Sequence, residues 1–355
     1  MELDEYAELL LGDGDGGREH LTLMKLQEQW LERVGRSSDF FSAMLASAKV
    51  VGSTCVALAG VRGVNEVAFD LCIVDEASKA TATEVLIPMT RSRKTILVGD
   101  PKQLPPFFER AILDSEALAE FDESEIRENV FDRLLKSLPD ASKAKLYHQY
   151  RMVRPIGNLV SEVFYEGQLK SPIDRPEISF PSFTKMVTWL DTSALVIKEP
   201  EVKIGTSWTS PLECRVVRAT LQQLDFVARN RKKIYDVAVI AGYSAQVRAL
   251  EDAIRDYRST WSGLTIRINT VDAFQGSEAD VCIYSVVRSN DRGDAGFLNE
   301  PPRLNVALSR ARSLLLVVGD YAFCRGLPID HPMSSVVEYI DRTAEDCEVR
   351  TLDDA

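Results

Sequence analysis

Acidic and amide side chains directly follow two apolar runs early in the chain. Asp75 and Glu76 come after the run LCIV (71–74), and Gln103 lies in the GDPKQLPP loop (99–106), which begins after the run TILV. A carboxylate at the carboxyl end of a buried parallel strand points into the crevice where α/β sheets bind ligands. There Asp75 could hold Mg²⁺, and Glu76 could deprotonate a water that attacks a phosphate. Gln103, in a loop stiffened by proline, would suit a sensor of that phosphate. Taken alone, each motif also fits an ordinary turn.

Three later segments combine arginine with polar and glycine residues. They are the QYRM segment (149–152), the TVDAFQGSE segment (270–278) and the NVALSRAR segment (305–312). An arginine that reaches a γ-phosphate from a neighbouring domain stabilises developing charge and makes hydrolysis depend on domain closure. Arg151 and Arg310 are the candidates for that role. Seen by itself, the NVALSRAR segment is better explained as an amphipathic helix with solvated arginines.

Short runs rich in Val, Ile and Leu must position these motifs. Such runs, separated by stretches of helical pattern, are typical of strands buried on both faces of a parallel sheet. The runs are 49–58, 69–77, 94–100, 145–150, 186–191, 236–242, 265–271, 280–287 and 313–320. Between some of them, residues 212–228 and 245–257 have a helical pattern. The sequence therefore predicts an α/β fold with parallel sheets.

The domain organisation follows from where the runs pause. Residues 108–143 are charged and helical in pattern, so the break between two sheets is expected near 140–146. We predict a first domain at 1–143, with a helical insertion at about 108–143, and a second domain at 144–325. Residues 326–355 are acidic and weakly patterned, which favours a C-terminal tail.

Bulk composition limits the classes of protein to which the chain can belong. Its 355 residues are too many for one ordinary core. The net charge of −12 argues against a simple basic nucleic-acid surface, although a motor can confine its basic residues to a channel. No long apolar run predicts a membrane span, and no basic start predicts a secretory signal, so the cytoplasm is the expected compartment. The six cysteines form no C-x-x-C pair, which favours reduced thiols over a zinc site.

The order of the motifs carries more information than any one of them. DEAS (75–78), the GDPKQLPP loop, and the QYRM, TVDAFQGSE and NVALSRAR segments together resemble the superfamily-1 helicases of the 5′→3′ branch. The resemblance is strongest to the group that contains the nonsense-mediated-decay RNA helicase and the helicase–nucleases of lagging-strand processing. It runs from about Lys49 to Asp320. It implies two RecA-like P-loop NTPase domains, with ATP between them and single-stranded DNA or RNA across their tops.

The resemblance also assigns roles residue by residue. Asp75 would bind Mg²⁺, Glu76 would be the catalytic base, and Gln103 would sense the γ-phosphate. Tyr150 would stack on the adenine, Glu278 would contact the nucleotide, and Arg151 and Arg310 would be arginine fingers. Thr54, in a run (53–58) that resembles a strand touching nucleic acid, and Thr270 would contact the phosphate backbone. The run IAGYSAQ (240–246) lies where the family has a strand that ends in a Tyr and a Gln.

One element of the family pattern is missing. The G-x-x-x-x-G-K-[S/T] loop should precede DEAS, yet the chain contains no Gly-Lys dipeptide. That loop supplies backbone N–H groups, a lysine and a ligand of Mg²⁺ to the bound phosphates. We therefore expect a first domain that is incomplete at its N-terminus, and a separate chain or an upstream segment that carries the loop. The alternative is a non-catalytic helicase-like scaffold that binds nucleic acid or a partner chain.

Overall fold

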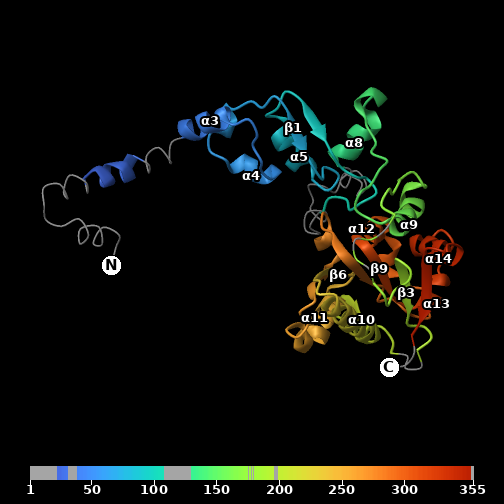
Figure 1. The fold of residues 1–355 in the computed structure, drawn as a ribbon. Coiled ribbons are helices and arrows are strands. Elements are labelled where there is room, and N and C mark those ends of the chain that lie inside the picture. Colours follow the sequence, from blue (N-terminus) through green and yellow to red (C-terminus); the bar gives the residue numbers. More distant parts are fainter. Residues whose placement is uncertain are drawn as a thin grey trace, which may run out of the picture. The chain divides into compact units, whose positions relative to one another are not determined.

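The chain divides into two compact units in a computed structural model (Figure 1). Residues 22–30, 38–107, 129–174, 176, 178, 180–195 and 199–352 are the part of the chain that the structure describes. Unit 1 comprises Met1–Asp100 with Pro106–Leu134, and unit 2 comprises Pro101–Pro105 with Leu135–Ala355. The GDPKQLPP loop is thus shared: its first two residues belong to unit 1, and the next five belong to unit 2.

Unit 1 contains a small parallel sheet of two strands, β1 (Cys72–Val74) and β2 (Thr95–Leu97). Its described helices include residues 22–30, α3 (Ser38–Ser47), α4 (Cys55–Gly60), η1 (Val64–Glu66) and α5 (Ala82–Met89), and α8 (Val130–Ser137) begins in it. Both strands coincide with apolar runs that predicted them. Helix α5 connects β1 to β2, as a parallel pair requires.

The prediction of a strand at residues 53–58 is wrong, because residues 55–60 form helix α4. The side chain of Thr54 accepts a hydrogen bond from the backbone N–H of Ala57, which caps that helix. A threonine with extended backbone and a free hydroxyl is a good N-cap residue. The apolar side chains of the run are mostly exposed or half-buried, and only Leu58 is buried.

Unit 2 is built on a sheet of six strands that are all parallel to one another. Their order is β10 (Cys347–Thr351), β3 (Val187–Asp191), β9 (Ala311–Gly319), β8 (Ala279–Ser285), β6 (Tyr235–Ala241) and β7 (Leu264–Thr270). The central strands read as continuous apolar runs because both of their faces are covered. The α/β class with a parallel sheet, predicted from those runs, is confirmed.

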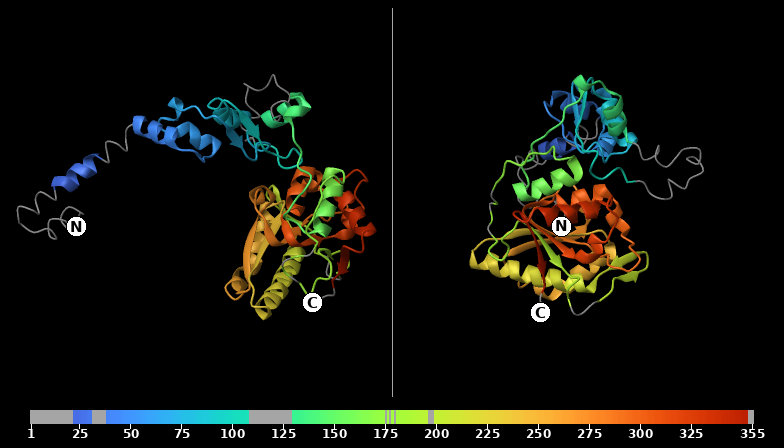
Figure 2. Two further views of the ribbon diagram at one scale, coloured as in Figure 1. Left: turned by 45° about the horizontal axis from the view of Figure 1, so that its top comes forward. Right: turned by 90° about the vertical axis from the view of Figure 1, so that its right-hand side faces the viewer.

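Helices cover both faces of this sheet (Figure 2). Successive residues of a strand point to opposite faces, and accordingly Leu315 and Val317 of β9 join one core while Leu314 and Leu316 join the other. The first core also contains residues of α9 (Arg154–Tyr165), α12 (Pro301–Leu308), α13 (Tyr321–Arg325) and α14 (Pro332–Arg342), and the second contains residues of α10 (Pro211–Asn230) and α11 (Ser244–Arg258). Unit 2 also has the antiparallel hairpin β4 (Val202–Ile204) and β5 (Ser207–Thr209), and the short helices η3 (Asp140–Ser142), η4 (Val271–Phe274) and η5 (Gly296–Asn299).

The parallel arrangement gives the sheet two chemically distinct ends. At the amino edge, where the strands begin, Tyr235, Leu264 and the start of β8 and β9 lie in register. At the carboxyl edge, Ala241 is paired with both Thr270 and Ser285. A ligand at one edge is separated from a ligand at the other by the length of a strand.

Two further expectations differ from the structure. Residues 145–150 form no strand, only a bridge between His148 and Lys170. Leu146 is 81% exposed, so this run lacks the burial that stabilises a strand. The stretch after residue 326 is not a separate tail, because α14 packs in the core and β10 pairs with β3. Strand β10 is at the end of the sheet and half-buried, and so its sequence carries no continuous apolar run. Among the described residues, no helix is long and apolar enough to span a membrane.

Candidate functional site

The two predicted acidic residues of unit 1 lie directly beyond β1. Asp75 and Glu76 are both exposed, and Oδ1 of Asp75 accepts a hydrogen bond of 2.9 Å from the backbone N–H of Glu76. Glu76 has φ 54°, in the left-handed region that few residues other than glycine adopt. The turn therefore presents both carboxylates at the carboxyl end of a parallel strand, as the sequence predicted.

This turn is packed against the start of the GDPKQLPP loop. The N–H of Ala77 donates to the carbonyl of Val98 (2.8 Å), and Oγ of Ser78 accepts from the N–H of Asp100 (3.1 Å). A Cβ at Gly99 would lie 2.8 Å from the nitrogen of Ser78, so only glycine fits there. Two motifs that follow different strands are thus joined within unit 1.

Asn129 also holds the turn, and the sequence analysis missed it. Its buried amide donates to the carbonyl of Ser78 (2.9 Å), while its Oδ1 accepts from the N–H of Asp132 (2.7 Å) at the start of α8. The second bond is that of a helix cap, which sequence alone can suggest. The first bond depends on a partner far away in the sequence, which sequence alone cannot suggest.

The remainder of the GDPKQLPP loop is fixed in unit 2 by the NVALSRAR segment. The fully buried Asn305 donates to the carbonyl of Lys102 (2.9 Å) and to the hydroxyl of Tyr165 (2.8 Å). Leu104 is buried in the core of unit 2, and Gln103, between the two anchored residues, is half-buried. Asn305 was quoted in the motif without a role, and it here connects two of the motifs.

Gln149 shapes the QYRM segment. Its Oε1 accepts from the N–H groups of Arg151 and Met152, and its Nε2 donates to the Met152 carbonyl and to Oγ of Ser171. These four bonds hold the backbone in a tight turn. Tyr150 projects from that turn with 73% of its surface exposed, at the position predicted to stack on adenine.

Arg151 joins a line of ion pairs at the amino edge of the sheet. Its Nε donates to Glu278 (3.0 Å), whose other carboxylate oxygen accepts from Arg312 (3.2 Å). Arg312 also donates to Asp280 (2.6 Å). These side chains are between 12% and 43% exposed. The QYRM, TVDAFQGSE and NVALSRAR segments, far apart in sequence, therefore meet at one place.

Arg310 lies beside this line but is buried, at 1% exposure. Its guanidinium donates to the carbonyls of Val306 (2.9 Å) and Ser277 (3.1 Å) and to the hydroxyl of Ser309 (2.8 Å). These three acceptors are neutral and belong to unit 2. A phosphate, as an anionic acceptor, forms stronger hydrogen bonds with arginine than these groups do.

The two threonines predicted to contact nucleic acid lie elsewhere. Thr54 is exposed in unit 1, where it caps α4. Thr270 is half-buried at the carboxyl edge of the sheet in unit 2, and its N–H donates to Oδ1 of Asn269. Thr270 and Glu278 belong to one segment, yet they lie at opposite edges of the sheet. Strands β7 and β8 are both parallel to β6, so the chain leaves β7 at the carboxyl edge, at Thr270, and enters β8 at the amino edge, after Glu278.

The carboxyl edge carries a network of ion pairs around a buried arginine, and no sequence motif predicted it. Arg288, with a side chain that is 3% exposed, pairs with Glu201 (3.1 Å) and Asp294 (2.9 Å) and donates to the hydroxyl of Tyr243 (3.3 Å). Its guanidinium also stacks on the ring of Trp208, 4.4 Å from the centroid. Tyr243 belongs to the IAGYSAQ run, so its role is to orient an arginine within unit 2.

Next to this network lies a strained residue, Val287. Its φ is 74°, a conformation that costs a β-branched residue on the order of 1–3 kcal/mol. Both carboxylate oxygens of Glu213, a residue of α10, accept from the N–H of Val287, at 2.8 and 3.0 Å. Burial raises the pKa of the Glu213 carboxyl to about 8, although the hydrogen bonds from Ser285 and Val287 act in the opposite direction.

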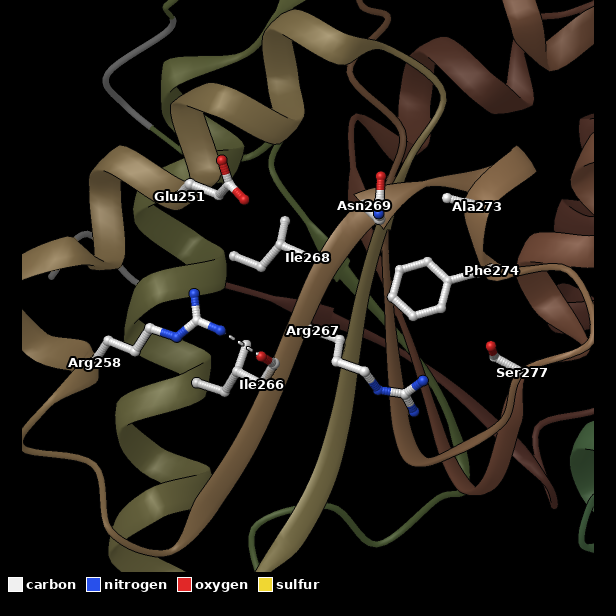
Figure 3. A pocket seen from close by; sticks show the side chains of 9 residues that line it. All are labelled: Glu251, Arg258, Ile266, Arg267, Ile268, Asn269, Ala273, Phe274 and Ser277. Carbon is white, nitrogen blue, oxygen red and sulfur yellow. Dashed lines mark hydrogen bonds between the residues drawn. The ribbon is translucent and has the colours of Figure 1, made fainter. Parts of the chain in front are cut away.

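A pocket of about 270 Å³ opens beside β7, the last strand of the sheet (Figure 3). Arg258, Arg267 and Phe274 line it, and the Arg267 guanidinium lies 5.6 Å from the centroid of the Phe274 ring. Arg267 is bound to Asp236 and to the carbonyl of Glu278. None of the residues predicted to do chemistry lines this pocket. Within the described ranges, no group of three or more His, Cys, Asp or Glu residues could hold a metal.

Comparison with known proteins identifies the class to which this fold and these motifs belong. Two family models, each described as an AAA domain, match residues 15–109 and 126–322. The chain belongs to this family and, within it, to the superfamily-1 helicase group of the 5′→3′ branch. The family resemblance read from the motif order is confirmed.

Three relatives illustrate the similarity. The chain is 32% identical over 272 residues to the probable helicase MAGATAMA 3 of Arabidopsis thaliana, covering 74% of this chain and 31% of the relative. It is 33% identical to the DNA-binding protein SMUBP-2 of Rattus norvegicus, over 71% of this chain and 25% of the relative. It is 34% identical to the DNA polymerase alpha-associated DNA helicase A of Saccharomyces cerevisiae, over 71% of this chain and 38% of the relative. The chain thus spans well under half the length of these relatives.

Among solved structures, the chain is similar to the C-terminal domain of a possible DNA helicase from a Lactobacillus strain. It covers 57% of this chain and 98% of its own, with 15% identity and a TM-score of 0.32.

Proposed function

We propose that this chain forms part of a motor that hydrolyses ATP and moves along single-stranded nucleic acid. The observation that carries the proposal is the meeting of three separate motifs at the amino edge of unit 2, where Arg151 contacts Glu278 at 3.0 Å. Partly exposed arginines beside an exposed aromatic ring are suited to a nucleotide, which brings a planar base and charged phosphates. Helicase relatives support the same function.

The residues of unit 2 would divide the work of binding and stabilising ATP. Tyr150, which is exposed, would stack on the adenine, and Glu278 would contact the nucleotide. Arg151 and Arg310 would donate to the phosphates as charge develops during hydrolysis. For Arg151 this means exchanging a half-exposed ion pair, and for Arg310 it means exchanging hydrogen bonds that include those to the carbonyls of Val306 and Ser277. Gln103, held between two anchored residues, would sense the γ-phosphate.

The carboxylates of unit 1 fit the ion that accompanies ATP. Mg²⁺ prefers oxygen ligands, and it commonly uses one or two carboxylates together with phosphates and waters. Asp75 is an exposed carboxylate with such chemistry, and Mg²⁺ held there would neutralise phosphate charge. Glu76, whose side chain is exposed beside it, would accept a proton from the attacking water.

The nucleic acid would be bound through its backbone. Thr54 and Thr270 would donate to phosphates, with Thr270 at the carboxyl edge of the sheet. Contacts of this kind serve DNA and RNA alike, favour single strands and weaken steeply with salt. The test is a titration of labelled single-stranded and duplex oligonucleotides at several salt concentrations. Binding that is duplex-specific or insensitive to salt would contradict this part of the proposal.

The absence of a Gly-Lys dipeptide bears on catalysis by the chain alone. A nucleoside triphosphate carries about four negative charges, and a P-loop normally binds them with N–H groups and a lysine. We therefore propose that the chain hydrolyses ATP only together with a polypeptide, in cis or in trans, that supplies this loop. The second candidate function is a non-catalytic scaffold, which the burial of Arg310 also fits.

The deciding experiment compares ATP turnover by the chain alone with turnover by the chain complemented with a segment that contains G-x-x-x-x-G-K-[S/T]. Turnover that is stimulated by nucleic acid and appears only on complementation is the expected result. Turnover by the chain alone near 1–100 s⁻¹, roughly the range of phosphoryl-transfer enzymes, would mean that another residue binds the phosphates. A complemented protein that binds nucleic acid but never hydrolyses ATP would favour the scaffold.

A further inference from the structure

The turn that follows β8 has a backbone that its own residues do not favour. Val287, a β-branched residue, is held at φ 74° and is 1% exposed. Such a conformation persists only where the surroundings enforce it, and such residues cluster at functional sites. The enforcing group is Glu213, whose two carboxylate oxygens both accept from the Val287 N–H. This buried pair was not predicted from the sequence.

Glu213 is itself fixed by hydrogen bonds that reach the β4–β5 hairpin. The hydroxyl of Ser285 donates to Glu213 (2.5 Å) and accepts from the amide of Gln246 (2.9 Å). The amide oxygen of Gln246 then accepts from Thr209 and from the N–H of Ser210, each at 2.8 Å. The five residues of this network are all buried, namely Thr209, Ser210, Glu213, Gln246 and Ser285. A buried polar network in which the members satisfy one another holds its elements rigidly.

The residues beyond Val287 extend this scaffold to the surface. Arg288 supports the half-buried indole of Trp208, and Lys203 lies 5.6 Å from the centroid of the same ring. Glu201 accepts from the N–H of Ser289 (2.7 Å) and from the amide of Asn290 (3.2 Å). An aromatic ring flanked by cations is the chemistry on which bases of a single strand stack. This ring depends on Arg288, and Arg288 directly follows the strained residue.

We propose that Glu213 is a positioning residue for single-stranded nucleic acid: it holds Val287 in its strained conformation and so fixes Arg288 beneath the Trp208 ring. The inference rests on the proposed function, because it assumes that the strand is bound at the carboxyl edge. Glu213 itself does not touch the strand. Its effect passes through one backbone N–H and one arginine to the ring that does.

The test measures the affinity of the full chain for fluorescein-labelled oligo(dT) and oligo(U) at low salt. Glu213→Ala should weaken binding about tenfold, the change that follows from releasing a strained turn of this kind. Glycine adopts φ 74° without strain, so the double variant Glu213→Ala/Val287→Gly should recover binding to within about threefold of the parent. Glu338→Ala, an exposed glutamate on α14, is the matched control and should leave affinity unchanged.

The recovery by glycine distinguishes positioning from general stability. Removal of the buried Val287 side chain weakens packing, whereas glycine relieves the backbone strain, so the free energy of unfolding of each variant is measured by urea denaturation beside its affinity. Affinity that only follows the free energy of unfolding, a double variant that binds worse than the single one, or a folded Glu213→Ala chain with parental affinity would overturn the inference. If Glu213→Ala fails to fold, Glu213→Gln with and without Val287→Gly is compared by the same assay and by hydrogen exchange at the Val287 N–H. A parent chain that binds neither oligonucleotide would overturn the proposed function, and the inference with it.

Discussion

The amino and carboxyl edges of the same sheet use charge in opposite ways. At the amino edge, Arg151, Glu278 and Arg312 form ion pairs whose side chains are 32–43% exposed. At the carboxyl edge, Arg288 and Glu201 are paired with side chains only 3% and 6% exposed. Exposed pairs contribute about 0–1 kcal/mol, whereas breaking a buried pair costs about 3–5 kcal/mol. The amino edge can therefore exchange its partners for a ligand, while the carboxyl edge serves as a rigid support.

Under the proposed function, this difference separates chemistry from binding. An ATP-binding edge must release its arginines to phosphates, and the partly exposed ion pair of Arg151 permits that. An edge along which a nucleic-acid strand moves must keep its surface unchanged. A buried network whose polar groups satisfy one another's hydrogen bonds ensures this. Each prediction below asks whether a change at one edge affects only the function assigned to that edge.

The largest effect is expected at the amino edge. In the complemented protein, Arg310→Ala should lower ATP turnover by roughly 10³-fold or more, the scale of an arginine finger, while nucleic-acid affinity stays near that of the parent. The measurement is steady-state hydrolysis with a parallel binding titration. Arg325→Ala, at a residue of α13 whose side chain is 66% exposed, is the control and should leave turnover unchanged. A loss of only a few-fold for Arg310→Ala would make it a structural arginine.

The second effect concerns the stability of the carboxyl edge. The Glu213 carboxyl has a pKa raised from 4.5 to about 8 by burial, and the negative charge of Asp320 also raises it. Between these two values the folded chain keeps a proton that the unfolded chain has lost, so the free energy of unfolding falls as pH rises and levels off above 8. The slope is at most about 1.4 kcal/mol per pH unit.

Glu213→Gln removes this titration. As pH rises from 5 to 8, the Tm of the parent should therefore fall relative to the Tm of Glu213→Gln. Thermal unfolding in buffers across that interval measures it. A Tm difference that is constant with pH would mean that Glu213 does not titrate there, and the carboxyl edge would be less buried than its contacts indicate.

The third effect separates binding from chemistry within the amino edge. Tyr150→Ala should raise the KM for ATP about tenfold, since stacking contributes about 1–3 kcal/mol per base, with kcat little changed. A change in KM alone indicates an interaction made equally in the ground and transition states. Tyr150→Phe keeps the ring and should behave like the parent. If Phe is as impaired as Ala, the hydroxyl and not the ring contacts the nucleotide.

The features of the fold and of the candidate site that could be predicted from the sequence are those whose patterns lie within one short stretch of the chain. Strands β1, β2, β3 and β6 to β9 lie in apolar runs, and for β3, β6, β8 and β9 the reason is that both faces of the six-stranded sheet are covered. Strand β10 and the β4–β5 hairpin were missed, because edge and surface strands bury few side chains. The motif order gave the family, whereas the hydrogen bonds of Asn129 and Asn305 could not be found, since their partners are remote in sequence.

Glu213 shows why a correct local pattern can still mislead. Ser210 and Glu213 have the spacing of a capping box, and Oγ of Ser210 does accept from the Glu213 N–H at 3.3 Å. In a capping box the glutamate would return to the N-cap backbone, as Glu84 does to Thr81 in α5. Glu213 instead bonds Val287 on β8. The same spacing thus serves a local cap in one helix and a distant strained turn in the other.

The smallest effect tests the carboxyl edge at a single hydroxyl. Thr270→Ala should weaken single-strand binding about threefold, because one hydrogen bond contributes about 0.5–1.5 kcal/mol, and ATP turnover at saturating nucleic acid should not change. Thr265 is on the same strand at the other end and is exposed, so Thr265→Ala removes an equal hydroxyl near the amino edge. Fluorescence titrations of both variants at low salt give the comparison. Equal losses for the two variants would mean that the nucleic-acid strand is not confined to one edge of the sheet. The division between an amino edge that exchanges its ion-pair partners and a carboxyl edge that supports the nucleic acid would then not hold.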